Sequence, residues 1–176
     1  MELEKYLEGL GFGESEIDEI MIYAGNDIDV SGIKNKVEYL NNLKCSSKVI
    51  RIIIEENPLF LLTELDEIKK VIEYLKEKGL EEYITEILEM EPEFISTKIE
   101  VIRKNEEILK LIVPESNIKI LLRDRTVIFT YNNDYLANRL RLLVEHGLKE
   151  KIAKIILNYI EIFDLEDDEI DFEELK

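Results

Sequence analysis

Apolar residues, glycines and prolines recur along this chain with a period of about 34 residues, and this period constrains the fold more than any other feature. Three glycines are evenly separated by twice that period: Gly11, Gly79 and Gly147. Apolar pairs recur once per period in the same register: Phe94-Ile95, Ile128-Phe129 and Ile162-Phe163. Independent markers that stay in phase indicate internal repeats. Each unit must then stack on its neighbours, because it is too short to bury its apolar face alone.

Each repeat carries the signals of two helices and a short turn. A first helix ends at the glycine, which suits the left-handed residue that closes a helix, and a second helix follows, as in residues 81–90. A break comes at Pro58, Pro92 or Thr126 before a short apolar step. Plausible N-caps of the next long helix are Thr63, Ser96 and Asn132-Asn133-Asp134. Residues 126–130 have strand propensity, but the repeat phase favours a helical unit there.

These signals predict an all-α helical-repeat solenoid that forms a single domain over residues 1–176. The domain would hold four units and a partial fifth. The acidic segment 164–176 is expected to form a capping helix that buries Ile170. Residues 105–131 are the least regular, because Val113 stands in place of the glycine and Pro114 follows it.

The motif within each unit narrows the family. Three alanines are too few for tetratricopeptide repeats, and the Thr-Pro-Leu-His motif of ankyrin repeats is absent. In this pattern a helix ends near a proline, and a Leu or Phe follows two residues later. A Ser or Thr comes next, and then a long helix that ends in Leu-x-x-x-Gly. It is clearest in residues 54–79, 88–96 and 121–147. Over roughly residues 3–163 the chain resembles the mitochondrial transcription termination factor (mTERF) repeat family. The resemblance implies two helices and a 3₁₀ turn per unit, a curved superhelix, and nucleic-acid binding through a basic concave face.

The net charge of the chain is negative, unlike the basic face that the resemblance implies. Forty acidic and 23 basic residues give a net charge of −17, which repels a phosphate backbone at long range. Heavy use of Ile, Lys, Glu and Asn indicates an AT-rich, bacterial genome. A single cysteine suits a reducing cytoplasm, and no apolar run approaches the roughly 20 residues that span a bilayer, so we expect a cytoplasmic protein without a membrane partner.

Counting the charge by repeat shows one basic unit. The net charge is −7 over 1–38, −1 over 39–73, −5 over 74–108, +3 over 109–142 and −7 over 143–176. A basic patch within 98–141 is therefore the candidate binding site, through Lys119, Arg123, Arg125, Arg139 and Arg141. The alternative is that these cations pair with neighbouring acids, such as those of residues 164–174. Tyr131 and Tyr135 could stack on bases, but packing is the preferred interpretation.

Catalytic and cofactor motifs fail on inspection. His146 has no matched nucleophile and suits a helix end. Cys45 falls at the repeat position of Phe12, Leu80 and Leu148, which predicts a small core residue. Glu14 stands where a dinucleotide-binding loop needs its third glycine, and no metal-spaced Cys/His cluster occurs. We expect no catalytic residue, metal or cofactor.

Three functions remain open at this point. The leading prediction is a non-enzymatic scaffold that binds a macromolecule, most readily a protein. The alternative is nucleic-acid binding, as the resemblance implies, through the basic patch. A third hypothesis is an acidic decoy of a DNA-binding protein.

Overall fold

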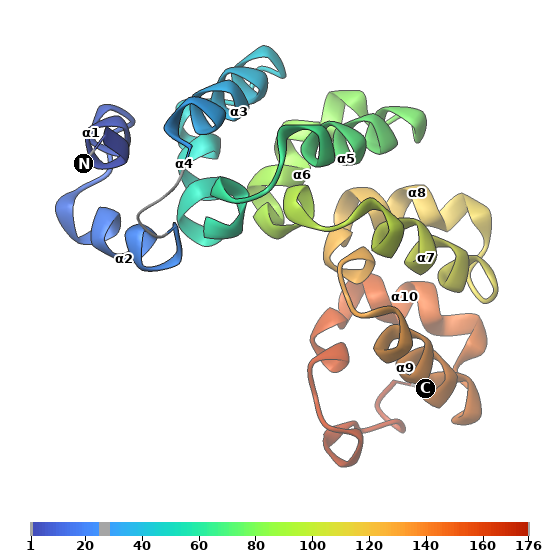
Figure 1. Ribbon diagram of the computed structural model, residues 1–176. Coiled ribbons are helices and arrows are strands. Elements are labelled where there is room, and N and C mark those ends of the chain that lie inside the picture. The colour runs from blue at the N-terminus through green and yellow to red at the C-terminus, as the bar shows by residue number, and fades with distance from the viewer. Residues whose placement is uncertain (1, 25–28, 176) are drawn as a thin grey trace. The chain divides into compact units, whose positions relative to one another are not determined.

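The computed structural model describes residues 2–24 and 29–175 of the chain, and all regular structure in these residues is helical (Figure 1). The α-helices are α1 (Glu2–Gly9), α2 (Glu14–Ala24), α3 (Val30–Asn42), α4 (Ser47–Glu56), α5 (Leu65–Glu77), α6 (Ile84–Met90), α7 (Ile99–Lys110), α8 (Glu115–Asp124), α9 (Asn133–Glu145) and α10 (Ile152–Asn158). The 3₁₀ helices are η1 (Pro58–Leu61), η2 (Glu81–Tyr83), η3 (Pro92–Ser96), η4 (Thr126–Phe129), η5 (Lys149–Lys151), η6 (Ile160–Phe163) and η7 (Asp167–Glu169). The all-α helical-repeat prediction is confirmed, and residues 126–129 are helical rather than a strand.

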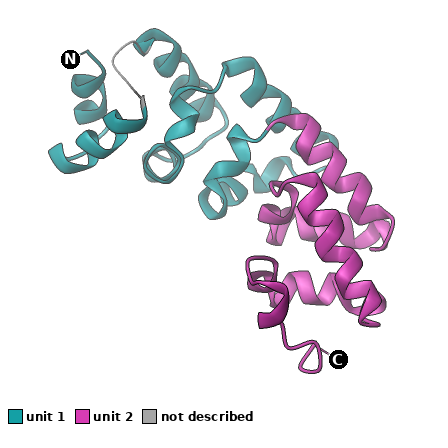
Figure 2. Ribbon diagram, turned by 60° about the horizontal axis from the view of Figure 1, so that its bottom comes forward, with its two compact units in different colours: residues 1–97 teal, residues 98–176 magenta. Residues whose placement is uncertain are grey.

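The chain divides into two compact units, residues 1–97 (unit 1) and 98–176 (unit 2) (Figure 2). Within unit 1, α1, α3 and α5 pack in order as one layer, and α2, α4 and α6 pack as a second. Within unit 2, α7 packs against α9, and α8 against α10. The single-domain organisation and the curvature of the stack stay predictions.

One phenylalanine per repeat anchors the 3₁₀ turn in the core. The four are fully buried and follow one another at the repeat spacing: Phe60, Phe94, Phe129 and Phe163. A buried aromatic ring contributes on the order of 2–3 kcal/mol of transfer free energy. The apolar step seen in the sequence is therefore the point where each turn is fastened to the core of its unit.

The first helix of a repeat ends in a left-handed residue, as the glycines predict. Gly11, Gly79 and Gly147 have φ of 90°, 67° and 78°. The residue after each glycine donates its backbone N–H to a carbonyl five residues earlier, as in Leu80 N to Leu75 O at 3.0 Å. Cys45 makes the same bond to Leu40 O at 3.1 Å and is buried, which confirms its core position; burial raises the pKa of its thiol.

The predicted N-caps are confirmed at one of three positions. The Asn132 side chain accepts from the backbone N–H groups of Asp134 and Tyr135 at the start of α9. Thr63 and Ser96 are wrong, because α5 and α7 begin two or more residues later and their first turns have no side-chain cap. The Thr63 hydroxyl donates to Leu59 O instead, and the Ser96 hydroxyl accepts from Asn57.

The expected capping helix over 164–176 does not form in the residues described. Only the 3₁₀ helix η7 is regular there, with turns after it. Four consecutive acids, Glu166 to Glu169, concentrate negative charge within this segment and disfavour a longer helix. Ile170 is buried as expected, and Phe172 stacks on His146 with ring centroids 3.6 Å apart. The segment therefore packs through single side chains rather than through an apolar helical face.

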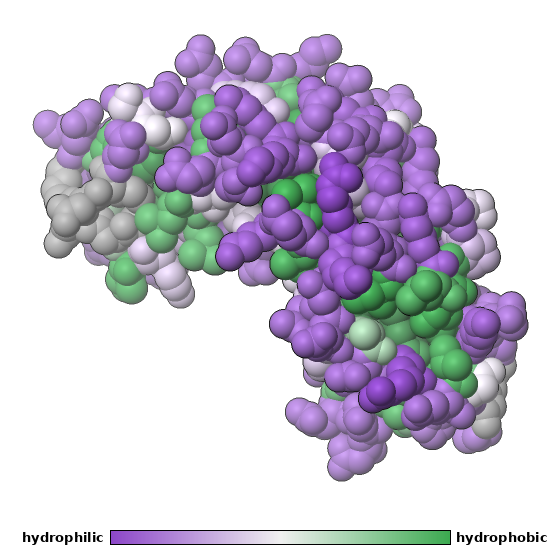
Figure 3. Space-filling model, turned by 45° about the vertical axis from the view of Figure 1, so that its right-hand side comes forward, coloured by the Kyte–Doolittle hydropathy of each residue, from purple (hydrophilic) through white to green (hydrophobic). Residues whose placement is uncertain are grey.

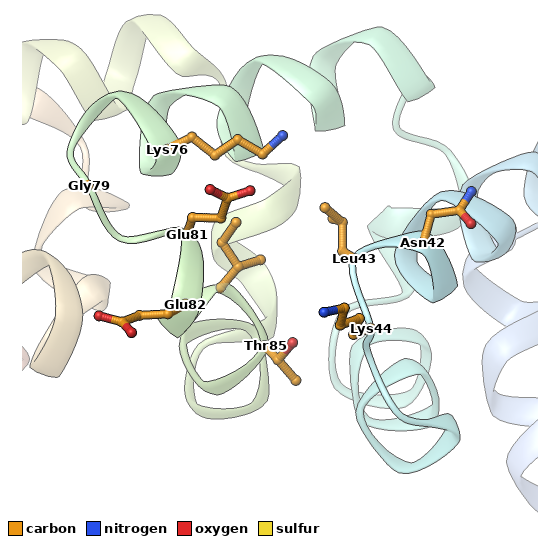
Figure 4. Close-up of a pocket in the computed structure, with 9 residues that line it drawn as sticks. Asn42, Leu43, Lys44, Lys76, Gly79, Glu81, Glu82 and Thr85 are labelled. Atoms are coloured by element: carbon orange, nitrogen blue, oxygen red, sulfur yellow. The ribbon is translucent and has the colours of Figure 1, made fainter.

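Lys44 adopts the left-handed conformation that three other repeats assign to Gly11, Gly79 and Gly147, with φ of 65°. It lies on the turn after α3, beside a cleft of about 730 Å³ that is also lined by the turn after α5 (Figure 4). In that view Leu43 and Lys44 lie on the turn after α3, and Glu81 of η2 and Thr85 of α6 lie across from them. A residue with a Cβ carries a strain of about 1 kcal/mol in this conformation.

Replacing Lys44 with glycine should therefore stabilise the protein relative to replacing it with alanine. Both variants remove the same charge, so their difference isolates the backbone. We expect Lys44→Gly to exceed Lys44→Ala by about 1 kcal/mol in the free energy of unfolding, measured by urea denaturation. Equal stability, or a more stable alanine variant, would contradict the strain assigned to this turn.

Candidate nucleic-acid interface

The five predicted basic residues divide between two places in unit 2. Lys119 and Arg123 lie on α8 and Arg125 directly follows it, whereas Arg139 and Arg141 lie on α9. α8 packs against α7 and α10, and α9 packs against α7. The structure therefore does not gather these five side chains on one helix face.

Arg139 is a buried structural residue. Only 5% of its side chain is exposed. Its Nη1 donates to Asp167 Oδ1 at 2.8 Å, and its Nη2 donates to the backbone carbonyl of Leu165 and to the Tyr135 hydroxyl. A phosphate could reach this guanidinium only by displacing the segment that follows η6. The prediction that the acidic segment pairs with basic residues of this unit is confirmed for Arg139.

The same repeat position has the same role elsewhere in the chain. Asn105 Nδ2, one repeat earlier, donates to the carbonyls of Phe129 and Tyr131 at 3.0 and 2.7 Å. Lys36 Nζ donates to three carbonyls at the end of η1, those of Phe60, Leu61 and Thr63, at 2.6–3.0 Å. We call Lys36, Asn105 and Arg139 the carbonyl-binding position. Its side chains are buried, and burial lowers the pKa of Lys36.

Arg123 and Arg125 are engaged locally. Arg123 binds Asp124 through two nitrogens, at 2.5 and 2.8 Å, and this hydrogen bonding lowers the pKa of Asp124. Arg125 Nη1 donates to the Asp124 carbonyl at 2.7 Å, and its Nε is buried without a hydrogen-bond partner. Neither guanidinium is fully available to a ligand.

Lys119 and Arg141 are the exposed members of the predicted set. Lys119 forms no ion pair among the described residues. Arg141 has 70% of its side chain exposed, and contacts Glu145 at 3.8 Å and Asn138 at 3.1 Å. Both can meet a solvent-borne anion with little rearrangement.

Tyr131 and Tyr135 pack within the fold, as preferred on sequence grounds. Their ring centroids lie 5.8 Å apart, and Tyr131 stacks on Phe163 at 6.2 Å. The Tyr131 hydroxyl donates to Asp164 at 2.7 Å, and the Tyr135 hydroxyl to the Phe163 carbonyl. These contacts engage both hydroxyls within the fold, and Tyr135 keeps 39% of its surface exposed.

Three further lysines were missed by the sequence analysis: Lys149, Lys151 and Lys154. They lie on η5 and α10, are exposed, and form no ion pair within the described part of the chain. Lys154 on α10 is equivalent in the repeat to Ile120 on α8, and Ile120 directly follows Lys119. Because α8 packs against α10, Lys119 and Lys154 lie at neighbouring repeat positions on two helices in contact. The net charge of residues 143–176 is negative in spite of these lysines, because residues 164–176 are strongly acidic. When the charge is summed separately on the two sides of Phe163, the basic character of the preceding residues is evident.

That division also separates the charge of the molecule. Residues 98–163 carry a net charge of +3 and residues 164–176 carry −7, whereas unit 1 carries −13. Hydrophilic side chains predominate on the face in Figure 3, with apolar side chains gathered in separate patches. The repeats of unit 2 thus carry a positive balance in a chain that is otherwise acidic.

The family model mTERF matches residues 5–171, nearly the whole chain. The chain belongs to the mTERF family. No curated protein matches it. The resemblance drawn from the repeat motif is therefore confirmed.

In the part of this mTERF chain that the structure describes, neither a metal-binding cluster nor a membrane-spanning helix is found. No group of three or more His, Cys, Asp or Glu side chains among the described residues is arranged to hold a metal ion. None of the helices in the described ranges is long and apolar enough to cross a bilayer.

Among the described residues of unit 1, the carboxyl group of Glu91 has a strongly raised pKa. Glu91 follows α6, and burial, reinforced by the charges of Glu93 and Glu56, raises its pKa to about 7. The folded state therefore binds this proton more tightly than the unfolded state does. The contribution of Glu91 to stability is greatest below about pH 4.5 and declines as the pH rises through 7.

Arg139 and Arg141 allow a matched test of the carbonyl-binding position. Arg139→Met removes the donor to Leu165 O and should lower the free energy of unfolding by about 1–3 kcal/mol. Arg141→Met removes the same charge from an exposed site and should cost less than about 0.5 kcal/mol. Urea denaturation of both variants measures the difference, and equal losses would contradict a structural role for Arg139.

Glu91→Gln should stabilise the protein in a pH-dependent way. Its advantage over the unmodified chain should grow between pH 4.5 and 7 and reach on the order of 2 kcal/mol above that range. The exposed Glu86→Gln on α6 is the control for loss of one charge. Denaturation midpoints across pH 4–8 give the comparison, and a Glu91→Gln curve parallel to that of the unmodified chain would exclude the half-buried Glu91 carboxylate as the cause.

Proposed function

We propose that this chain is a non-enzymatic helical-repeat protein that binds nucleic acid through unit 2. The observation that carries the proposal is the set of exposed lysines on α8, η5 and α10 that have no acidic partner among the described residues: Lys119, Lys149, Lys151 and Lys154. Membership of the mTERF family supports nucleic acid over other ligands.

The geometry favours contact with phosphates rather than reading of bases. Lysine ammonium groups are point charges on flexible stems, which suit phosphate oxygens on a backbone. The aromatic rings that could stack on bases, Tyr131 and Tyr135, are engaged in the fold. Binding should therefore depend strongly on salt and weakly on sequence.

Of the five residues predicted from sequence, Lys119 and Arg141 remain in the proposed interface. Arg139 leaves it because it is buried, and Arg123 and Arg125 contribute less because Asp124 binds both. The protein-scaffold and decoy hypotheses call for a protein partner instead. They stay predictions, as does a cytoplasmic location.

Neutralising three of the lysines tests the proposal. Lys119→Gln/Lys151→Gln/Lys154→Gln should weaken binding to short labelled DNA or RNA by about tenfold or more at ~50 mM salt. It should also lower the salt slope by about two to three. Fluorescence anisotropy with single- and double-stranded probes measures both quantities.

A matched triple variant in unit 1 controls for total charge. Lys69→Gln/Lys70→Gln/Lys76→Gln removes the same charge from lysines that each contact an acid on α5, and should leave affinity within about twofold. Equal weakening by both variants, or no binding of any probe at ~50 mM salt, would overturn the proposal.

A further inference from the structure

Unit 1 contains an acidic groove whose chemistry is opposite to that of the lysines in unit 2. Its volume is about 380 Å³, and it lies among α2, α4, η1 and η3. Its lining combines carboxylates with apolar side chains: Glu16, Glu19, Ile20, Tyr23, Glu55, Glu56, Leu59 and Glu93, with Asn57 and Pro58. We call this set the acidic groove.

We propose that the acidic groove docks a cationic peptide segment of a partner protein, with an apolar side chain of that segment seated against Tyr23 and Leu59. The partner is thus a basic polypeptide with at least one apolar residue among its lysines or arginines. This interaction is separate from nucleic-acid binding, because the same carboxylates repel phosphate.

The charges of the groove are left uncompensated by the fold. Glu19, Glu55, Glu56 and Glu93 are exposed, and none of them forms an ion pair within the residues described. Glu16 alone is paired, with Arg51 at 2.9 Å. Elsewhere in unit 1 acids have cations at hand, as in Asp66 with Lys69 and Glu67 with Lys70. A basic segment would supply the missing counter-charges.

Two apolar side chains of the groove are unusually exposed. Tyr23 is 64% exposed and Leu59 is 61% exposed. Ring and aliphatic surface next to carboxylates suits the stems and apolar neighbours of lysine and arginine, whose charged heads reach outward. Charge alone would attract many cations, but this pairing of apolar surface with carboxylates selects an amphipathic one.

The electrostatic field beside the groove is strong enough to act on a neighbouring group. Glu56 and Glu93 both help to raise the pKa of Glu91. The carboxylates are too dispersed for a metal site, since no three His, Cys, Asp or Glu side chains among the described residues are arranged to hold a metal ion. Several spaced cations along a peptide match their distribution better than one compact ion.

The test uses the full-length chain and a labelled peptide of Lys-Lys-Leu-Lys repeats at about 100 mM salt, which screens long-range attraction. Glu55→Gln/Glu56→Gln should weaken binding about fivefold or more. Glu81→Gln/Glu82→Gln, an exposed adjacent pair on η2 outside the groove, should change it less than about twofold. Leu59→Ser should also weaken binding, whereas Leu62→Ser, exposed outside the groove, should not.

Each outcome decides the matter. Equal effects of the two glutamate pairs would reduce the interaction to general attraction and overturn the proposal, as would an absence of saturable binding. Retained affinity in Leu59→Ser would overturn the apolar contact. Circular dichroism checks that each exposed substitution leaves the fold intact. The triple lysine variant of unit 2 should keep its peptide affinity, so failure of the nucleic-acid proposal and failure of this one remain distinguishable.

Discussion

Stacking of the repeats depends on hydrogen bonds between a buried side chain of one repeat and the carbonyls at the end of a later 3₁₀ turn. Each turn buries a phenylalanine, and carbonyls at or just after its end are buried or part-buried and need donors. Lys36, Asn105 and Arg139 supply those donors. At the intervening repeat position Val71 has no donor to offer, and Asn57 binds Pro92 O of η3 instead. An unpaired buried carbonyl costs about 1–3 kcal/mol, so each of these contacts stabilises the packing of one repeat on the next.

The carbonyl-binding position also determines how the segment after η6 packs. Asn105 contacts both Tyr131 O and the side chain of Asn133, and Arg139 contacts Leu165 O and the side chain of Asp167 in the same register. The segment after η6 thus occupies the place where a further repeat would begin. It does so with only the short 3₁₀ helix η7 and no α-helix, because its acids favour solvent and only a few apolar side chains are available.

The fold could be predicted from sequence because its markers are local and periodic. Gly11, Gly79 and Gly147 close helices as their spacing predicts, and Cys45 falls in the core. The N-caps predicted at Thr63 and Ser96 are wrong, because the Thr63 hydroxyl donates back to Leu59 O and the Ser96 hydroxyl accepts from Asn57, a contact that only the fold creates. The candidate site was harder still. Burial of Arg139 and exposure of Lys151 and Lys154 depend on which face of a helix packs and on where the acidic segment lies. Neither the buried face of a helix nor the position of the acidic segment can be deduced from the net charge of each repeat.

Binding of nucleic acid by the lysines of unit 2, and not by unit 1, is the proposal on which the function of this chain depends. Backbone amide chemical shifts, followed by NMR during titration with a short DNA or RNA at ~50 mM salt, test it directly. We expect shifts concentrated in α8, η5 and α10, around Lys119, Lys151 and Lys154, that disappear as salt is raised. Shifts concentrated in residues 1–97, or none anywhere at low salt, would contradict it.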